Sequence, residues 1–554
     1  MQSSKEKADT LNRQFESVFT IDQDNETSVS DLLPTSSHPT LKEITITDAG
    51  ILKMLNGLNV HKAAGPDQIS PRILKELSST ITPILGTIFR KSYNTGTIPE
   101  AWRQANVVPI FKKGNKADPA NYRPISLTSI VCKLMEHIIT SSIMHHAKNS
   151  SRPMLYDLQH GFREKRSCET QLIEFCTDIT NHLQHGFQTD VIVLDFSKAF
   201  DKVSHKKLLT KLDFYGIRGK TNAWIASFLR NRTQNVVLDG EKSYTGNVVS
   251  GVPQGSVLGP SLFLFYINDL PEGLSSKVRL FADDTVLYMA VANSGDAKIL
   301  QSDLDKLQEW EKNWSMEFNP NKCEVIHITR SRNTCRNSYY MHGVALASVH
   351  STKYLGITLT SDLRWNKHID QITSKANRSL NFIKRNLQIS NPALKTAAYN
   401  SLVRPILEYA PTIWDPHTKT NIDKIEMVQR RAARYVLHRH HNRSSVSSML
   451  HFLGWTSLQQ RREQARLCMM YKIHAGDVAI HKNHYMTLAP LSILNTNGLR
   501  YIVPYSRCDY HLYSFFPRTI RSWNNLPSDI VEACSYNAFK SRLMVHYGTR
   551  PAPM

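Results

Sequence analysis

The sequence KVRLFADDTVLY, residues 277–288, decides the fold of the central part of the chain. Two β-type segments, Val278–Phe281 and Thr285–Tyr288, flank the acidic turn Ala282–Asp284, a pattern that predicts a β-hairpin with two carboxylates at its tip. Neighbouring carboxylates repel each other, so this arrangement is costly unless a positive charge lies beside them. Asp is also favoured in turns for its local hydrogen bonds, so the pair alone is compatible with a purely structural turn.

A third carboxylate follows an apolar run upstream. The sequence VIVLDF, residues 191–196, has four apolar residues before Asp195, which predicts a buried central strand that delivers a carboxylate at its end. Together with Asp283 and Asp284 it forms an oxygen-only set, which suits Mg²⁺ better than zinc or copper. Two such ions, about 3.5–4 Å apart, serve phosphoryl transfer, one at the attacking hydroxyl and one at the triphosphate.

Strand and helix patterns around these motifs predict an α+β body. Up to about residue 360, short β-rich runs alternate with helical patterns at Ile73–Leu77, Cys132–Met144 and Ser302–Trp314. The β-rich runs are VVPIF from residue 107, VIVLDF from 191, NVVL from 235, KVRLFADDTVLY from 277, CEVIHI from 323 and YLGITL from 354. Beyond residue 361, apolar residues recur every three or four positions, which predicts amphipathic helices. Residues 1–60 are polar and broken by turn signals, so apart from a helical turn around Leu11–Phe19 we expect a flexible extension.

Charge and length narrow the class of protein. The 554 residues carry 68 Lys or Arg against 47 Asp or Glu, a formal charge of +21, which favours a polyanionic partner such as nucleic acid. Residues 361–480 hold 19 Lys or Arg against 8 Asp or Glu, so about half of the excess lies there. Arg430, Arg431 and Arg434 flank an apolar helical stripe; they form either a solvated polar face or a surface that lies on phosphates.

The sequence has no apolar run of the roughly 20 residues that cross a bilayer, and no signal peptide at its start. We therefore expect no membrane partner and an intracellular location. The eight cysteines contain no C-x-x-C pair, which argues against a disulfide framework or a zinc ribbon. Cys508 and His511 have the spacing of half a zinc finger, but the matching half is missing.

At these motifs the sequence resembles the reverse transcriptases of LINE-type, non-LTR retrotransposons. The resemblance covers about residues 61–360 and rests on ordered motifs around FADD: HKAAGPDQISPRILKE from His61, VVPIFKKG from Val107, ANYRPISLTSIVCKLMEHII from Ala120, QHGFREKRSCETQL from Gln159, DFSKAFDKVSH from Asp195, GVPQGSVLGPSLFLFYINDLP from Gly251, NPNKCEVIHI from Asn319 and YLGITL from Tyr354. The later segments KIEMVQRRAARYVL and FPRTIRSWNNLPSDIV resemble jockey-like members.

The resemblance implies a right-hand polymerase fold with a palm built on an antiparallel sheet. The implied divisions are fingers at 61–190, palm at 191–360, a basic helical thumb at 361–480 and a region of unknown role at 481–554. The implied activity is RNA-directed DNA polymerisation with two Mg²⁺, for which Mn²⁺ is a possible substitute. The implied partners are an RNA template, a DNA primer or target DNA, and dNTPs, in a cytoplasmic ribonucleoprotein and in the nucleus.

The resemblance also implies roles for single residues of the palm. Asp195, Asp283 and Asp284 match the metal-binding carboxylates, with Asp284 as the weakest candidate for direct contact with the metal. Phe200 matches the steric gate that excludes a ribose 2′-OH, although a Phe packed in a core helix has the same sequence signature. Gln254 matches a residue that lines the incoming nucleotide.

Outside these, Lys112, Lys113 and Arg123 match the cations of the fingers that meet the triphosphate, and a guanidinium can bind phosphate oxygens in pairs. Lys322 matches a lysine able to protonate the departing pyrophosphate. The primer grip, which holds the 3′-OH end, corresponds to Tyr354, Leu355 and Gly356. Arg430, Arg431 and Arg434 fall in the implied thumb, where they would contact a nucleic-acid backbone.

The chain also departs from the family pattern. Gln68 stands where the motif usually has Gly, and we expect neither an endonuclease in residues 1–60 nor an RNase H segment or zinc knuckle in the tail. An endonuclease in the full-length element is therefore a possible partner. One alternative is a decayed or domesticated copy that binds RNA without polymerase activity. Another is a maturase-like splicing cofactor that shares the palm, which the tail segments disfavour.

Overall fold

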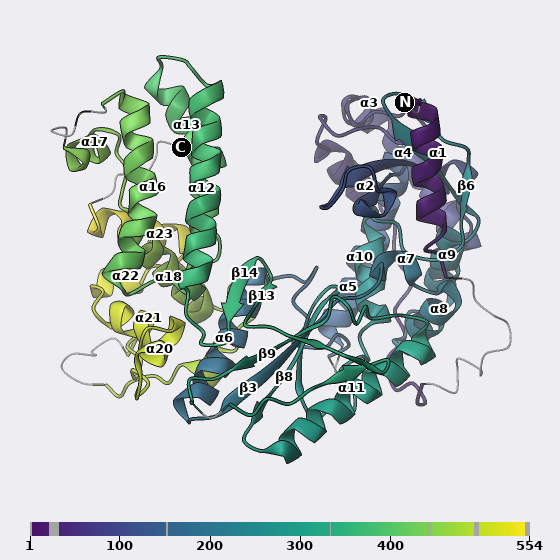
Figure 1. Cartoon of the computed structure of the whole chain (residues 1–554). Coiled ribbons are helices and arrows are strands. Elements are labelled where there is room, and N and C mark those ends of the chain that lie inside the picture. The colour runs from purple at the N-terminus through teal and green to yellow at the C-terminus, as the bar shows by residue number, and fades with distance from the viewer. Residues whose placement is uncertain are drawn as a thin grey trace.

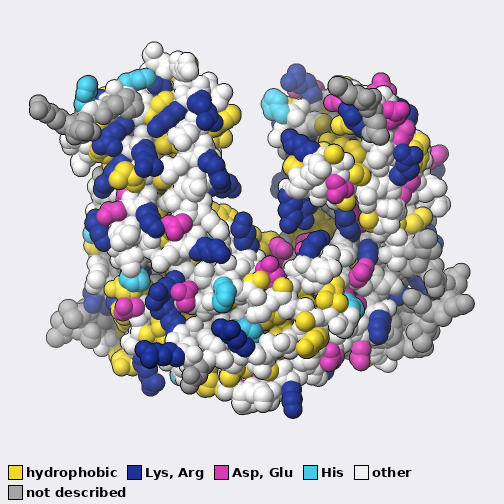
Figure 2. Space-filling model, in the orientation of Figure 1, with side chains coloured by type: hydrophobic (Ala, Val, Ile, Leu, Met, Phe, Trp, Pro, Cys, Tyr) yellow, Lys and Arg dark blue, Asp and Glu magenta, His cyan; other side chains and the backbone are white. Residues whose placement is uncertain are grey.

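The computed structural model describes residues 3–20, 33–150, 153–332, 334–439, 441, 445–491 and 498–548. Two columns of elements rise from a central sheet and enclose an open trough (Figure 1). Figure 2 shows Lys and Arg side chains on both walls of this trough and acidic side chains near its base. The strongly basic composition is therefore displayed where a long polyanion has room to lie.

The base is a five-stranded sheet in the order β12-β9-β3-β8-β7. Its strands β9, β3, β8 and β7 pair antiparallel, as predicted for the central motifs, and only the short β12 pairs parallel to β9. The strand bounds are β3 (Gln188–Leu194), β7 (Lys277–Phe281), β8 (Asp284–Val291), β9 (Glu324–Ile328) and β12 (Ala347–Ser348).

Helices cover both faces of the base sheet. Side chains of a strand alternate between faces, so Ile192 and Leu194 pack toward α11 (Ser294–Trp314), whereas Val191 packs toward α6 (Cys168–Gln184). Each such buried side chain contributes roughly 1.5–3 kcal/mol to folding. Burial on both faces explains why the run before Asp195 is apolar at every position.

The amino-terminal column contains a second sheet, in the order β2-β1-β4-β5 with β6 paired to β4. Its strands are β1 (Gln104–Phe111), β2 (Tyr122–Leu127), β4 (Arg232–Leu238), β5 (Glu241–Lys242) and β6 (Gly246–Val248). The surrounding helices are α1 (Ser4–Glu16), α2 (Asp48–Asn56), α3 (Pro71–Glu76), α4 (Ser78–Thr95), α5 (Ile130–Asn149), α7 (Ala199–Lys202), α8 (His205–Phe214), α9 (Gly219–Leu229) and α10 (Leu258–Tyr266). The short 3₁₀ helices are η2 (Glu100–Trp102) and η3 (Pro119–Asn121).

The prediction that residues 1–60 form a flexible extension was wrong for the described part of this segment. Helix α1 buries Ala8, Leu11 and Phe15 against Val107 and Val236 of the second sheet. Helix α2 likewise buries Ile51 and Leu55 in the main core. Polar residues between these sparse apolar positions hide the amphipathic pattern in the sequence, while the tertiary contacts supply the stability.

The carboxyl-terminal column is helical, as predicted for residues beyond 361. It is formed by α12 (Asn366–Asn386), α13 (Pro392–Leu402), α14 (Arg404–Glu408), α15 (Pro411–Trp414), α16 (Lys419–Leu437), α17 (Val446–Phe452) and α18 (Leu458–Ala475). The tail adds α19 (Lys482–Tyr485), α20 (Asp509–Leu512), α21 (Phe515–Asn524), α22 (Ser528–Val531) and α23 (Tyr536–His546), and buried residues of α21 and α23 share the core of α18. In Figure 1, α12 lies between α16 and the trough.

Two small hairpins complete the fold: β10 (Tyr340–Met341) with β11 (Val344–Ala345), and β13 (Ser351–Tyr354) with β14 (Ile357–Thr360). The sequence YLGITL predicts a single β-rich run, but it spans the turn of the second hairpin. Leu355 has φ 43° and Gly356 has φ 83°, and two left-handed residues in succession make the tight turn that reverses a strand.

Candidate active site

The three carboxylates meet because of strand register. Phe281 pairs with Asp284, so Ala282 and Asp283 form a two-residue turn between β7 and β8. On the neighbouring strand Leu194 pairs with Thr285, and the next residue, Asp195, therefore emerges beside Asp284. The predicted hairpin with an acidic tip is confirmed, and the base sheet presents all three carboxylates at one edge.

The carboxylates perturb one another. Burial, together with the negative charges of Asp283 and Asp195, raises the pKa of Asp284 to about 6. Burial also raises the pKa of Asp283, while the positive charge of Arg123 lowers it. A group that concentrates negative charge in this way favours a cation beside it.

Cations from the amino-terminal column face this acidic edge. Lys112 follows β1, and Arg123 lies on β2, opposite Ile110. The pKa of Lys112 is lowered by its burial and by the charge of Arg123, whereas Asp195 raises it. The structure thus brings Lys112 and Arg123 to the carboxylates, and Lys113 follows on the same exposed turn.

Lys322 reaches the site from a loop before β9. Its Nζ lies 3.3 Å from Oδ2 of Asp195, with more than half of the lysine side chain exposed. The loop is fixed because Asn319 donates its backbone N–H to the carbonyl oxygen of Asp195 at 2.8 Å. Phe318 stacks on Phe196 with ring centroids 4.1 Å apart, which anchors the same loop to the end of β3.

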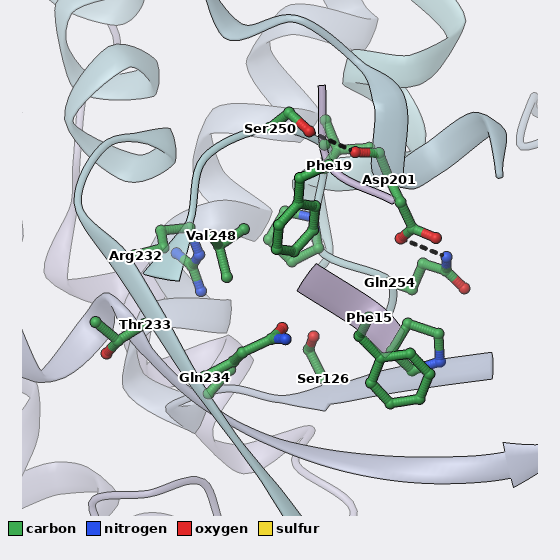
Figure 3. A pocket seen from close by; sticks show the side chains of 15 residues that line it. Phe15, Phe19, Ser126, Asp201, Arg232, Thr233, Gln234, Val248, Ser250 and Gln254 are labelled. Carbon is green, nitrogen blue, oxygen red and sulfur yellow. Dashed lines mark hydrogen bonds between the residues drawn. The ribbon is translucent and has the colours of Figure 1, made fainter. Parts of the chain in front are cut away.

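The loop that carries Gln254 is hydrogen-bonded to α7, the helix that carries Phe200. Phe200, on α7, accepts a hydrogen bond from the N–H of Val252 at 2.8 Å, and its ring stacks on Phe263 with centroids 4.4 Å apart. Gln254 donates from Nε2 to Oδ1 of Asp201 at 3.0 Å (Figure 3). Gly251 has φ 85°, and a Cβ there would lie 2.8 Å from Asp201, so only glycine lets the loop approach α7 this closely.

The amino-terminal segment supports this loop from behind. Phe15 and Phe19 line a pocket of about 40 Å³ together with Asp201 and Gln254 (Figure 3). Thr20 donates its N–H to Oγ of Ser250 at 2.8 Å and its hydroxyl to the carbonyl of Lys202 at 3.0 Å. The pocket is far below the roughly 300–1,000 Å³ of ligand sites, so it is a packing gap and not the nucleotide site.

Gln159 and Gly161 support the acidic turn, and no role for them was predicted. Oε1 of Gln159 accepts the N–H of Ala282 at 3.0 Å and that of Gly161 at 2.8 Å. A Cβ on Gly161 would lie 2.3 Å from the nitrogen of Ala282, so the turn rests directly on this glycine. The motif QHGFREKR was visible in the sequence, but its contact with a turn more than 120 residues away was not.

A buried glutamine joins the acidic hairpin to the predicted primer grip. Nε2 of Gln171 donates to Oη of Tyr354 at 3.2 Å and to the carbonyl of Leu280 at 3.4 Å. We call Leu355 and Gly356, the turn of the β13–β14 hairpin, the grip turn. Oη of Tyr409 donates to the carbonyl of Leu355 at 3.0 Å and holds the turn from the other side. Tyr354 is buried and Gly356 is exposed, so it is the tip of the hairpin that faces outward.

A basic groove of about 970 Å³ continues from the grip turn along α12. Its lining includes Gly356 and Tyr409 and the cations Lys353, Lys367, Lys375 and Arg378, with Asp370 as the acid. Arg430, Arg431 and Arg434 lie on α16 and are not part of this lining. Arg431 donates instead to Oδ1 of Asn377 on α12 at 3.2 Å.

No group of three or more His, Cys, Asp or Glu side chains within the described ranges is arranged to hold a metal ion by itself. The two Mg²⁺ ions therefore stay a prediction. All eight cysteines are free, and Nδ1 of His511 lies 2.8 Å from Oγ of Ser506. None of the helices in the part of the chain that the structure describes is long and apolar enough to cross a bilayer.

Comparison with known proteins agrees with the motifs. Residues 110–359 match the family model described as reverse transcriptase (RNA-dependent DNA polymerase). The chain is 28% identical over 418 residues to the RNA-directed DNA polymerase from mobile element jockey of Drosophila melanogaster, covering 72% of this chain and 44% of that protein. It is 27% identical over 464 residues to the probable RNA-directed DNA polymerase from transposon BS of the same species, covering 78% and 50%. The chain thus spans about half the length of these relatives.

Proposed function

Because residues 110–359 match a reverse transcriptase family model and the chain is similar to the polymerase of mobile element jockey, we propose that it is an RNA-directed DNA polymerase of the LINE type that extends a DNA 3′-OH along an RNA template. One observation carries the proposal: the register of β3, β7 and β8 brings Asp195, Asp283 and Asp284 to one edge of the base sheet, from which the two columns rise. Cations from two other segments face the same edge. This set suits transfer of a nucleotidyl group, in which negative charge develops on phosphate oxygens.

In this proposal the amino-terminal column acts as fingers, the base sheet as palm and the carboxyl-terminal column as thumb. The trough between the columns then receives the RNA–DNA duplex, and the grip turn at Leu355 and Gly356 holds the primer end. The exposed tip of that turn and its link to the acidic hairpin through Gln171 support this arrangement. The partners are the RNA template, a DNA primer or nicked target DNA, and dNTPs.

The carboxylates fit divalent Mg²⁺, since the donor atoms are all oxygen and their mutual repulsion calls for a cation. Asp195 and Asp283 are the residues that would hold the ions, with Asp284 beside them, and Mn²⁺ would fit the same donors. When bound, the ions supply activation of the primer hydroxyl and charge neutralisation on the triphosphate.

The remaining polar groups act on the nucleotide. Arg123 and Lys112 bind oxygens of the triphosphate, and Lys113 adds charge nearby. Lys322, already 3.3 Å from Asp195, is placed to give a proton to the departing pyrophosphate. Gln254 lines the nucleotide and Phe200 stands where a ribose 2′-OH would clash.

Primer extension tests the proposal. Purified full chain is incubated with poly(rA)·oligo(dT), dTTP and Mg²⁺, beside Asp283→Asn and the exposed-surface control Asp305→Asn. We expect extension by the wild type and the control, and none by Asp283→Asn. Absence of extension by the wild type, with tight RNA binding retained, would contradict the proposal and favour a non-catalytic RNA-binding protein.

Nucleotide selection tests the gate separately. Phe200→Ala removes the ring that stacks on Phe263, so the variant should accept ribonucleotides more readily than the wild type. The ratio of dTTP to UTP incorporation is the measurement. An unchanged ratio, with extension intact, would assign Phe200 to core packing alone.

A further inference from the structure

A second basic and aromatic site lies outside the trough. We call it the junction pocket, because its lining comes from the end of β9, the start of α12, the loop after α15 and helix α20. Its volume is about 370 Å³, within the range of ligand sites. The side chains used below are Arg330, Arg364, His417, Tyr510 and Tyr513.

Strand register separates the junction pocket from the carboxylates. Strand β9 runs antiparallel to β3, with Glu324 opposite Val193 near Asp195 and Ile328 opposite Thr189 at the far end. Arg330 follows two residues beyond Ile328, eight positions along the register from Asp195, so the pocket lies roughly 26 Å from Asp195 at about 3.3 Å per residue. No residue of the junction pocket belongs to the basic groove along α12.

The wall of the pocket covers an unusual concentration of buried positive charge. Asp415, which lines the pocket, accepts from Nε of Arg462 at 2.7 Å and from Nε of Arg466 at 3.0 Å, and Nη2 of Arg518 lies 3.1 Å from its Oδ2. Glu463 is one further carboxylate that acts on Arg518. Three guanidinium groups thus share two carboxylates.

Part of this charge has no hydrogen-bond partner. Arg462 is 1% exposed, and neither its Nη1 nor its Nη2 has a partner among the described residues, and the same holds for Nη1 of Arg466. Burial lowers the pKa of Arg518 to about 10, and the neighbouring arginines oppose its charge as well. Uncompensated buried charge is costly, and an anionic ligand in the adjoining pocket would offset it.

Aromatic rings stand above these charges. His417 and Tyr513 stack with centroids 4.0 Å apart and an angle of 5° between their planes, and Tyr513 is 37% exposed. The guanidinium of Arg330 lies 4.5 Å from the ring centroid of Tyr510. Arg364 adds an exposed cation, while Asp509 is the exposed acid of the lining. Rings beside arginines are the combination that binds unpaired bases and their phosphates.

We propose that the junction pocket binds single-stranded nucleic acid, with a phosphate near Arg330 and Arg364 and a base against Tyr513, the exposed tyrosine of the lining. The site would hold a strand that leaves the trough or approaches it. RNA and DNA share this chemistry, so the strand type is a question for the experiment. The proposal goes beyond polymerase activity and does not depend on it.

The test measures binding to the full chain while the trough is occupied. An unlabelled RNA–DNA duplex is added to saturation, and a fluorescent oligo(rU) or oligo(dT) is then titrated and followed by anisotropy. We expect one of the two strands to bind at a second site that the duplex does not displace. Complete displacement of both oligonucleotides by the duplex would overturn the proposal.

Variants assign the second binding event to the pocket. Tyr513→Ala and Arg330→Gln should each weaken it about 10-fold, since one stacked base contributes about 1–3 kcal/mol. Tyr513→Phe keeps the ring and should bind as the wild type does, which excludes misfolding as the cause. Tyr505→Ala is the matched control, because Tyr505 is 78% exposed and lies outside the pocket.

Primer extension by the same variants separates this inference from the proposed function. Unchanged extension with lost single-strand binding is the expected result. Equal binding by Tyr513→Ala, Arg330→Gln and the wild type would overturn the site, whatever the extension assay gives.

Discussion

The acidic hairpin and the carboxyl-terminal column hold their charged side chains in different ways. At the hairpin, buried hydrogen bonds from Gln159 and Gln171 fix the backbone of a turn that bears like charges. Along α12, by contrast, exposed lysines and an arginine line an open groove with few fixed contacts. In the hairpin each residue has a fixed position that no neighbour can take over. In the groove along α12, several similar positive charges share the binding of one ligand. Substitutions should therefore act steeply at the hairpin and gradually along the column.

The largest effect is expected at the end of β3. Asp195→Asn removes a carboxylate that faces Lys322 and that we propose as a metal ligand, so extension should fall on the order of 10³-fold while the fold is kept. Extension rates and circular dichroism check both parts. A loss below tenfold would mean that Asp195 is not part of the reacting site.

The buried ion pairs beneath the acidic hairpin should contribute to the free energy of unfolding. Arg279, on β7 and 1% exposed at its side chain, pairs with Glu174 and Asp178 at 2.9 Å each. Arg279→Met removes the guanidinium that pairs with both buried carboxylates and leaves them to weaker partners such as Lys277 and His160, so the free energy of unfolding should drop by about 3 kcal/mol. Lys277→Met, which breaks a more exposed pair with the same Asp178, should cost less than about 1 kcal/mol. Denaturant unfolding measures both, and equal losses would contradict the distinction.

Substitution of Gln171, which joins the acidic hairpin to the predicted primer grip, should have an intermediate effect. Gln171→Leu removes both hydrogen bonds of a fully buried side chain and should cost about 1–3 kcal/mol. We expect roughly tenfold weaker use of the primer end, measured as the KM for duplex in extension. Tyr354→Phe removes only the bond to the grip and should do less. An equal or larger effect of Tyr354→Phe would place the support elsewhere.

The smallest effects are expected in the column. Lys375→Ala and Arg378→Ala should each weaken duplex binding a few-fold and reduce the salt dependence of the affinity by about one unit. Arg430→Ala, Arg431→Ala and Arg434→Ala should change it less, because these residues lie on α16 outside the groove. A larger loss of duplex affinity in the α16 variants than in the α12 variants would show that the arginines of α16 contact phosphates, as the sequence suggested.

The same contrast explains what could be predicted from the sequence. The three carboxylates were found because a strand ending in Asp and a hairpin with an acidic tip are local patterns, and antiparallel pairing then brings them together. The division into a sheet-containing part and a helical part was visible from the change of apolar period near residue 361.

Long-range packing was not visible. Nothing in the sequence near Gln159 or Gln171 indicates that their amides support a turn about 110–120 residues away. Helix α1 is longer than the helical turn expected around Leu11–Phe19, and its packing could not be predicted because three apolar residues gain their burial only from a distant sheet. The charge of residues 361–480 predicts a surface for polyanions, and helix packing decides that α12, not α16, lines the groove.

Single-turnover extension at saturating duplex, with the duplex Kd measured on the same samples, tests most directly whether the hairpin performs the chemistry and the column only holds the duplex. Asp195→Asn should abolish the rate and keep the Kd. The double variant Lys375→Ala with Arg378→Ala should keep the rate and raise the Kd. A rate that falls in the double variant at saturation, or one that survives in Asp195→Asn, would contradict this division of roles.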